Sequence, residues 1–192
     1  MAIAARAIVK IDRMVFIMLL GLLLMFQTSE YEIIPLSFYQ RSDVVQISKE
    51  LVGLYLFHQS IDGLVVGRIV ETEAYNGRTD RACHAFHKRT NRTEVMYEMG
   101  GRAYVYLCYG IHNLFNVVTN EEGMADAVLI KALEPVEGMD IMRTRTNKKT
   151  TEARLASGPG LVGKAMAFNT NQTGELLNDK IWVGRKLVDA RR

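Results

Sequence analysis

The segment GRIVETEAY, residues 67–75, carries two carboxylates and a phenol at alternate positions. Because side chains alternate between the faces of a strand, Glu71, Glu73 and Tyr75 would line one face, with the carboxylates about 7 Å apart. A carboxylate pair at this spacing suits acid and base catalysis at an acetal-like carbon. A solvent-facing polar strand is the alternative interpretation, and the apolar residues on both sides of the pair argue against it.

Residues 103–116 hold three closely spaced tyrosines and an asparagine within an apolar run. Tyr104 and Tyr106 would share one face of a strand, whereas Tyr109 would lie on the other face or in the turn that the following glycine favours. Such tyrosines either fill a core, where each hydroxyl needs a partner, or stack on bases. The amide of Asn116 must find hydrogen bonds or cost about 1–3 kcal/mol, so it is either a structural contact or a ligand contact.

Basic and aromatic residues alternate between residues 78 and 102, where six Arg and Lys side chains accompany Phe86 and two histidines. This mixture suits contact with phosphates combined with base stacking, although a surface loop of mixed charge would look similar. His84 has no second ligand at metal spacing, which favours a hydrogen-bonded histidine over a metal ligand.

Length and composition favour one packed domain. The chain has 192 residues, of which 48% are hydrophobic and 23% charged, so disorder along most of its length is excluded. Cys83 and Cys108 form no CxxC pair, which favours a reducing compartment over a disulfide-stapled secreted domain. The sequence contains no zinc-ligand spacing and no GxSxG elbow, so several cofactor and hydrolase classes are excluded.

Hydrophobic periodicity predicts the elements that would position these residues. A helix of about ten residues should begin at Asp43, whose side chain can cap the first turn. A second helix is predicted to start with Pro135 in its first turn. Alternation and turn residues predict an antiparallel set of strands at residues 54–59, 64–75, 103–109, 114–119 and 127–133. The expected fold is therefore α+β, a single domain with a curved, mostly antiparallel sheet and peripheral helices.

The two ends of the chain differ in character from its middle. Lys10 and Arg13 precede thirteen apolar residues, Met14 to Phe26, which are too few for the ~20 of a spanning helix. We expect residues 1–32 to be a leader outside the fold and residues 33–192 to form the domain, with a membrane tether as the alternative. Residues 141–192 carry 11 Lys and Arg against 4 Asp and Glu. This basic stretch either contacts phosphates or is a solvated loop.

Seven ordered blocks make the chain resemble a known family. The blocks are SFYQR, GRIVETEAY, DRACHAF, NRTEVMY, AYVYLCYGIHNLFNVV, AVLIKALEP and SGPG, and they span roughly Pro35 to Trp182. Together they resemble the alkyladenine (3-methyladenine) DNA glycosylase family. The resemblance implies a monofunctional base-excision enzyme that flips an alkylated or deaminated purine out of duplex DNA and hydrolyses its N-glycosidic bond. It implies no metal and no organic cofactor.

The resemblance also implies roles for individual residues. Glu73 would activate water for attack at C1′, and Lys131, where the family usually has arginine, would help to hold that water. Tyr75 and Tyr106 would sandwich the flipped base, with His84 beside it.

Two further roles follow from the same blocks. Asn116 would sit against the minor-groove edge of the base and disfavour guanine, and Tyr109 would be the wedge that fills the vacated stack. The family continues through further strands after Trp182, so a shortened C-terminus is expected.

Damaged double-stranded DNA is the expected partner. The enzyme is expected to be a monomer without a stable protein partner, located in the cytoplasm and, in a bacterium, at the nucleoid. The expected substrates are 3-methyladenine, 7-methylguanine, hypoxanthine and ethenoadenine. Two alternatives stay open: a non-catalytic damaged-DNA-binding protein of the same fold, and a membrane-tethered hydrolase that uses Glu71 and Glu73 on a sugar.

Overall fold

The computed structural model describes residues 30–147, 151 and 154–187. Its contacts divide the chain into a unit of residues 33–186 and a second unit of residues 1–32 with 187–192. Most of the expected leader therefore falls outside the described residues, as do Lys148 and Lys149 of the basic stretch. Within the described part, no helix is long and apolar enough to cross a membrane.

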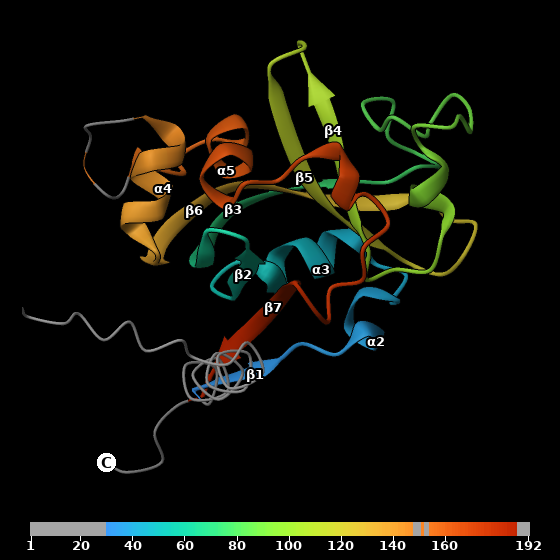
Figure 1. Ribbon diagram of the computed structural model, residues 1–192. Coiled ribbons are helices and arrows are strands. Elements are labelled where there is room, and N and C mark those ends of the chain that lie inside the picture. Colours follow the sequence, from blue (N-terminus) through green and yellow to red (C-terminus); the bar gives the residue numbers. More distant parts are fainter. Residues whose placement is uncertain (1–29, 148–150, 152–153, 188–192) are drawn as a thin grey trace, which may run out of the picture. The chain divides into compact units, whose positions relative to one another are not determined.

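The unit of residues 33–186 is built on a curved antiparallel sheet with the strand order β7-β2-β3-β6-β5-β4 (Figure 1). The expectation of an α+β fold with such a sheet is confirmed. A short strand, β1 (Tyr31–Ile33), precedes it. The six strands are β2 (Tyr55–Ser60), β3 (Gly63–Tyr75), β4 (Ala103–Cys108), β5 (His112–Thr119), β6 (Asp126–Glu137) and β7 (Ile181–Lys186).

Different elements pack on the two faces of the sheet. Helices α3 and α5 pack on β3, β5 and β6 over the larger core. A smaller cluster lies on the alternate positions of the strands, where Tyr104, Val118 and Ala127 meet residues of the segment between β3 and β4. The helices are α2 (Leu36–Tyr39), α3 (Val44–Leu51), α4 (Met139–Thr146) and α5 (Pro159–Met166), with 3-10 turns η1 (Glu94–Tyr97) and η3 (Thr170–Gln172).

The predicted cap of α3 is confirmed, because the side chain of Asp43 accepts a 2.9 Å hydrogen bond from the backbone N–H of Gln46. The prediction of a helix that starts at Pro135 is wrong. Pro135 lies inside β6 opposite Gly67, beside a register shift at which the missing N–H of proline is tolerated. The helix begins at Met139 instead, after Gly138, whose φ of 71° favours glycine.

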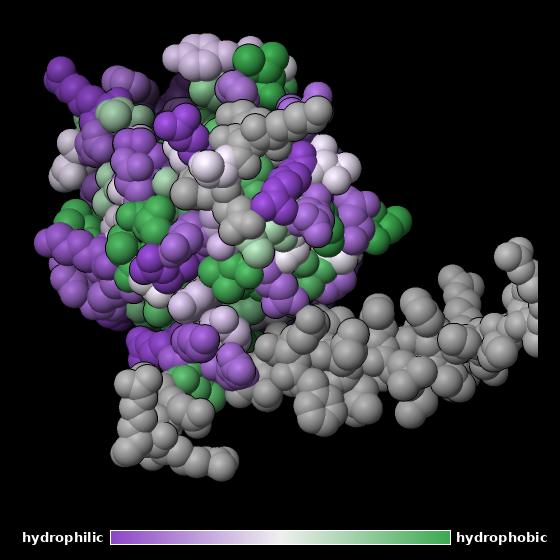
Figure 2. All heavy atoms as spheres, turned by 90° about the vertical axis from the view of Figure 1, so that its left-hand side faces the viewer, coloured by the Kyte–Doolittle hydropathy of each residue, from purple (hydrophilic) through white to green (hydrophobic). Residues whose placement is uncertain are grey.

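The basic stretch after residue 140 is partly structural. The guanidinium of Arg145 donates to the carbonyl of Ala165 at 2.9 Å and pairs with Asp62 at 3.2 Å, so it joins α4 to α5 and to the β2–β3 turn. Arg143 pairs with Asp140 at 2.7 Å. Figure 2 views the molecule from the side of α4, where hydrophilic residues alternate with separate apolar ones. Because its guanidinium is engaged by Ala165 and Asp62, Arg145 does not support the interpretation of the basic stretch as a phosphate contact.

Candidate active site

A cavity of about 320 Å³, including its open mouth, lies on the sheet face opposite α3 and α5. Four residues predicted to bind a base line it together: Tyr75 at the end of β3, His84 from the following segment, Tyr106 on β4 and Asn116 on β5. The other lining residues are Ala82, Cys83, Met96, Tyr104 and Ala127.

Aromatic rings form much of this wall. Tyr104 and Tyr106 stack with their ring centroids 5.5 Å apart, as expected for neighbours on one face of a strand. The ring of His84 meets Tyr106 edge-on at 4.5 Å. The guanidinium of Arg92 lies 5.9 Å from the Tyr106 ring centroid, close enough for a cation–π contact. Such walls suit a flat, electron-poor ring.

Tyr104 is a site residue to which the sequence analysis gave no role. Its hydroxyl lies 2.9 Å from Nδ1 of His84, so it fixes the orientation of that ring. Burial raises the pKa of Tyr104 to about 12, which keeps the hydroxyl protonated. Its position two residues before Tyr106, on the same face of β4, was the signal that could have identified it.

His84 is held in its neutral form. Burial lowers the pKa of His84 below its ordinary value, and the charge of Arg92 lowers it further. At neutral pH the imidazole therefore adds no positive charge to the cavity.

The sequence left open whether Asn116 makes a structural contact or a ligand contact, and its position allows both. The side chain is buried, and its amide nitrogen donates to the carbonyls of Tyr104 at 3.2 Å and Leu114 at 3.4 Å. It also lines the cavity. With both N–H groups directed at the backbone, its carbonyl oxygen is the polar atom that can meet a ligand.

The carboxylate of Glu73 is tied to the cavity wall and to a cation. The hydroxyl of Tyr75 donates to Glu73 Oε2 at 2.6 Å, and Lys131 Nζ lies 2.9 Å from Glu73 Oε1. Lys131 also pairs with Glu71 at 2.8 Å. Register shifts at Val70 and Lys131 make β-bulges in β3 and β6, which let one lysine reach both carboxylates.

These contacts keep Glu73 ionised. The hydrogen bond from Tyr75, and then that from Lys131, lower the pKa of Glu73 below its ordinary 4.5. The same carboxylates raise the pKa of Lys131, so the pair is a carboxylate beside an ammonium at neutral pH. Burial and the contact with Glu73 raise the pKa of Tyr75, which therefore stays a donor. A carboxylate that is ionised at neutral pH can accept a proton from a donor beside it.

Tyr109 lies apart from the cavity, at the tip of the β4–β5 hairpin that projects at the top of Figure 1. It occupies the turn, with a φ of 51°, and its side chain is 92% exposed. Leu107 and Ile111 beside it are exposed as well. The hairpin carries Tyr106 and Asn116 in its strands, so the exposed tip and two cavity residues belong to one element.

A family model described as methylpurine-DNA glycosylase matches residues 37–191 of the chain. The chain belongs to this family. The resemblance inferred from the seven sequence blocks is thus confirmed, and so is the enzyme class, a DNA N-glycosylase that hydrolyses N-glycosyl bonds. Members of the methylpurine-DNA glycosylase family act on DNA, which is therefore the class of substrate for this chain.

Several relatives cover most of the chain. A protein of Carboxydothermus hydrogenoformans is 45% identical over 150 residues, which is 78% of this chain and 77% of the relative. A protein of Natranaerobius thermophilus is 45% identical over 72% of this chain and 70% of its own length. One of Chlamydia felis is 40% identical over 81% of each chain. All three are provisionally named 3-methyladenine DNA glycosylase.

Within the described part of this methylpurine-DNA glycosylase, no group of three or more His, Cys, Asp or Glu side chains is placed to hold a metal ion.

Proposed function

We propose that this protein is a base-excision repair enzyme that flips alkylated or deaminated purines out of duplex DNA and hydrolyses their N-glycosidic bonds. The proposed substrates are 3-methyladenine, 7-methylguanine, hypoxanthine and ethenoadenine. One observation carries the proposal: Tyr75 lines an aromatic cavity and donates a 2.6 Å hydrogen bond to the carboxylate of Glu73. The names of the relatives support the same activity.

In this proposal the cavity receives the flipped purine. Tyr75 and Tyr106 provide aromatic faces for its ring, His84 lies beside it and Asn116 meets its edge. A 3- or 7-alkylated purine carries a positive charge, which aromatic faces attract and the neutral His84 does not repel. Damage also weakens base pairing, which lowers the cost of flipping.

The hydrolysis needs one base and one water. The water oxygen bonds to C1′ while the C1′–N bond breaks, the bonding electron pair leaves with the purine, and Glu73 accepts the proton of the water. A cationic alkylpurine becomes neutral as it leaves, so it needs no general acid. A neutral purine such as hypoxanthine leaves as an anion and must take up a proton, which balances the one that Glu73 removes from the water. Lys131, 2.9 Å from Glu73, holds the carboxylate and the water in place. We further propose that the protein acts as a monomer, without a metal or organic cofactor, on cytoplasmic or nucleoid DNA.

An excision assay tests the proposal. Duplexes that each contain one 7-methylguanine, 3-methyladenine analogue, hypoxanthine or ethenoadenine are incubated with the protein, and abasic strands are cut with alkali and resolved on a gel. We expect cleavage only after alkali, with the cationic lesions excised fastest. Binding to damaged duplex without any base release would contradict the proposal and favour the non-catalytic DNA-binding alternative.

Lys131→Ala should lower the single-turnover excision rate about ten-fold, in the range expected for loss of one charge-assisted hydrogen bond. The change removes the cation that lies between Glu71 and Glu73. Lys131→Arg is the matched control and should keep or raise the rate, because arginine retains the charge and adds a planar pair of donors. A parental rate for Lys131→Ala would show that the lysine is only a surface cation.

Tyr75→Phe should move the acid limb of the pH–rate profile to higher pH. The Tyr75 hydroxyl is the main group that lowers the pKa of Glu73, so its removal lets that pKa rise toward 4.5. The base is then protonated earlier as the pH falls, while the aromatic face is kept. Single-turnover rates measured from neutral to acidic pH check this shift, with uncatalysed base loss subtracted. An acid limb identical to that of the parent would disprove the coupling.

A further inference from the structure

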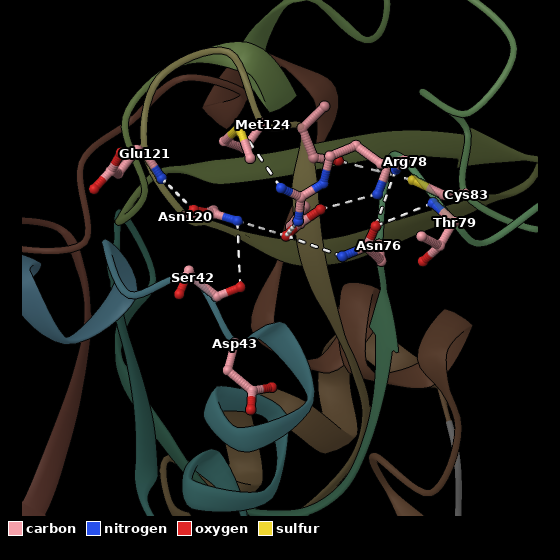
Figure 3. Close-up of polar contacts among 12 residues, drawn as sticks. Ser42, Asp43, Asn76, Arg78, Thr79, Cys83, Asn120, Glu121 and Met124 are labelled. Carbon is pink, nitrogen blue, oxygen red and sulfur yellow. Dashed lines mark hydrogen bonds and ion pairs between the residues drawn. The ribbon is translucent and has the colours of Figure 1, made fainter.

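A buried carboxylate outside the proposed chemistry lies next to the cavity. Asp126, the first residue of β6, has a fully buried side chain. It accepts hydrogen bonds from Asn120 Nδ2 at 2.7 Å, Gly77 N at 2.9 Å, Arg78 Nη2 at 3.0 Å and Asn76 Nδ2 at 3.4 Å. Figure 3 shows the side chains of Asn76, Arg78 and Asn120 converging on this point. A buried carboxylate is costly unless it is paired and hydrogen-bonded, and these donors meet that demand.

Three of the four donors belong to residues 76–78, which follow Tyr75 directly. The same segment continues to Ala82, Cys83 and His84, all of which line the cavity. Asp126 itself is followed by Ala127, another lining residue. The Asp126 carboxylate therefore joins residues 76–84, which include His84, to strand β6, which also lines the cavity.

Other contacts tie this segment to the β5–β6 connection. The Sγ of Cys83 lies 3.8 Å from the carbonyl oxygen of Ala125, and Arg78 Nη1 lies 3.7 Å from Met124 Sδ. At Gly77 a Cβ would lie only 2.5 Å from the Ala125 oxygen, so glycine alone permits this approach. These contacts are weak or purely steric, whereas the bonds from Gly77 N and from the Arg78 guanidinium to the Asp126 carboxylate are charge-assisted and therefore stronger.

We propose that Asp126, through its pair with Arg78, is a positioning residue that holds residues 76–84 on the sheet and thereby sets the place of His84 in the base-binding cavity. The expected effect on base excision rests on the function proposed above. A neutral purine leaves less readily than a cationic one and depends more on the fit of the cavity. Loss of the link should therefore reduce excision of a neutral lesion more than that of 7-methylguanine.

The first arm of the test needs no DNA. NMR signals of the His84 imidazole report its contact with Tyr104, and those of buried His58, bound to Gln172 and Met166, serve as an internal control. In Asp126→Asn and Arg78→Gln the His84 signals should shift, whereas the His58 signals should not. Arg78→Lys, which keeps the charge, should restore the parental signals in part. Unchanged His84 signals in both variants would overturn the proposal.

The second arm measures single-turnover rates on 7-methylguanine and on the neutral lesion that the parent excises fastest. The ratio of neutral to cationic excision should fall about ten-fold in Asp126→Asn, since small misplacements in a site can cost up to ~10² in rate. Val183→Ala, a core change in β7, is the matched control for lost stability and should lower both rates equally. A parental ratio in Asp126→Asn would overturn the proposal.

The outcomes separate the two claims. If the parent releases no base, the proposed function fails while the NMR arm still decides whether Asp126 places His84. If Asp126→Asn does not fold, Arg78→Gln carries both arms, because the side chain of Arg78 is 42% exposed and its loss is tolerated more easily.

Discussion

Tyr109→Ala should weaken binding to a duplex with a damaged purine and slow excision about ten-fold, because a wedge offsets an unstacking cost of a few kcal/mol. The free energy of unfolding should stay close to parental, since the Tyr109 side chain is 92% exposed at the hairpin tip. Equilibrium binding to damaged duplex, single-turnover excision and urea unfolding measure the three quantities.

Two control variants sharpen this test. Ile111→Ala removes an exposed apolar side chain from the same hairpin tip, and it should have a smaller effect on excision than Tyr109→Ala. Phe115→Ala removes a fully buried ring from β5 and should cost ~3–5 kcal/mol of unfolding free energy. A comparable loss of stability in Tyr109→Ala would identify Tyr109 as a core residue instead of a wedge.

Local sequence signals were sufficient for most of the sheet. Alternating residues bounded by glycine and polar turns predicted β3 and β4 to within a few residues, because strand pleating and turn chemistry are local properties. The cap at Asp43 was predictable for the same reason. Pro135 led to the wrong prediction of a helix start at this position. The pairing of β6 with β3 extends the strand past the proline, and this pairing depends on residues far away in the sequence.

The candidate site was predictable only in part. Alternation placed Glu71, Glu73 and Tyr75 on one face of a strand, and the family resemblance supplied their roles. The contact of Lys131 with both carboxylates needs the antiparallel partner strand and its bulges, which no local pattern encodes. The pair of Asp126 with Arg78 joins residues 48 positions apart and depends on the same long-range register.

Glu73→Gln should lower single-turnover excision by at least the ~10² associated with a general base. The amide keeps the shape of the side chain and can still accept a hydrogen bond from Tyr75, but it cannot take a proton from water. Rapid-quench measurements on a 7-methylguanine duplex, with enzyme in excess, give the rate constant without a contribution from product release.

Binding should survive in the same variant. Removal of a negative charge from a surface that faces DNA phosphates should leave the affinity for damaged duplex unchanged or raise it. The dissociation constant is measured with a duplex that carries the same lesion. Loss of affinity in proportion to the loss of rate would show that Glu73 supports the fold of the site instead of the chemistry.

The ratio of the single-turnover rate constants of Glu71→Gln and Glu73→Gln tests the central claim most directly. Both carboxylates pair with Lys131, at 2.8 and 2.9 Å, and both side chains are partly exposed, so the two variants are closely matched in charge and surroundings. They differ in their contact with the cavity wall, because Tyr75 donates a hydrogen bond to Glu73. If Glu73 activates the water, Glu71→Gln should be at least about ten-fold faster than Glu73→Gln on 7-methylguanine. Equal losses in the two variants, or near-parental excision by Glu73→Gln, would contradict the account and favour a paired-carboxylate mechanism.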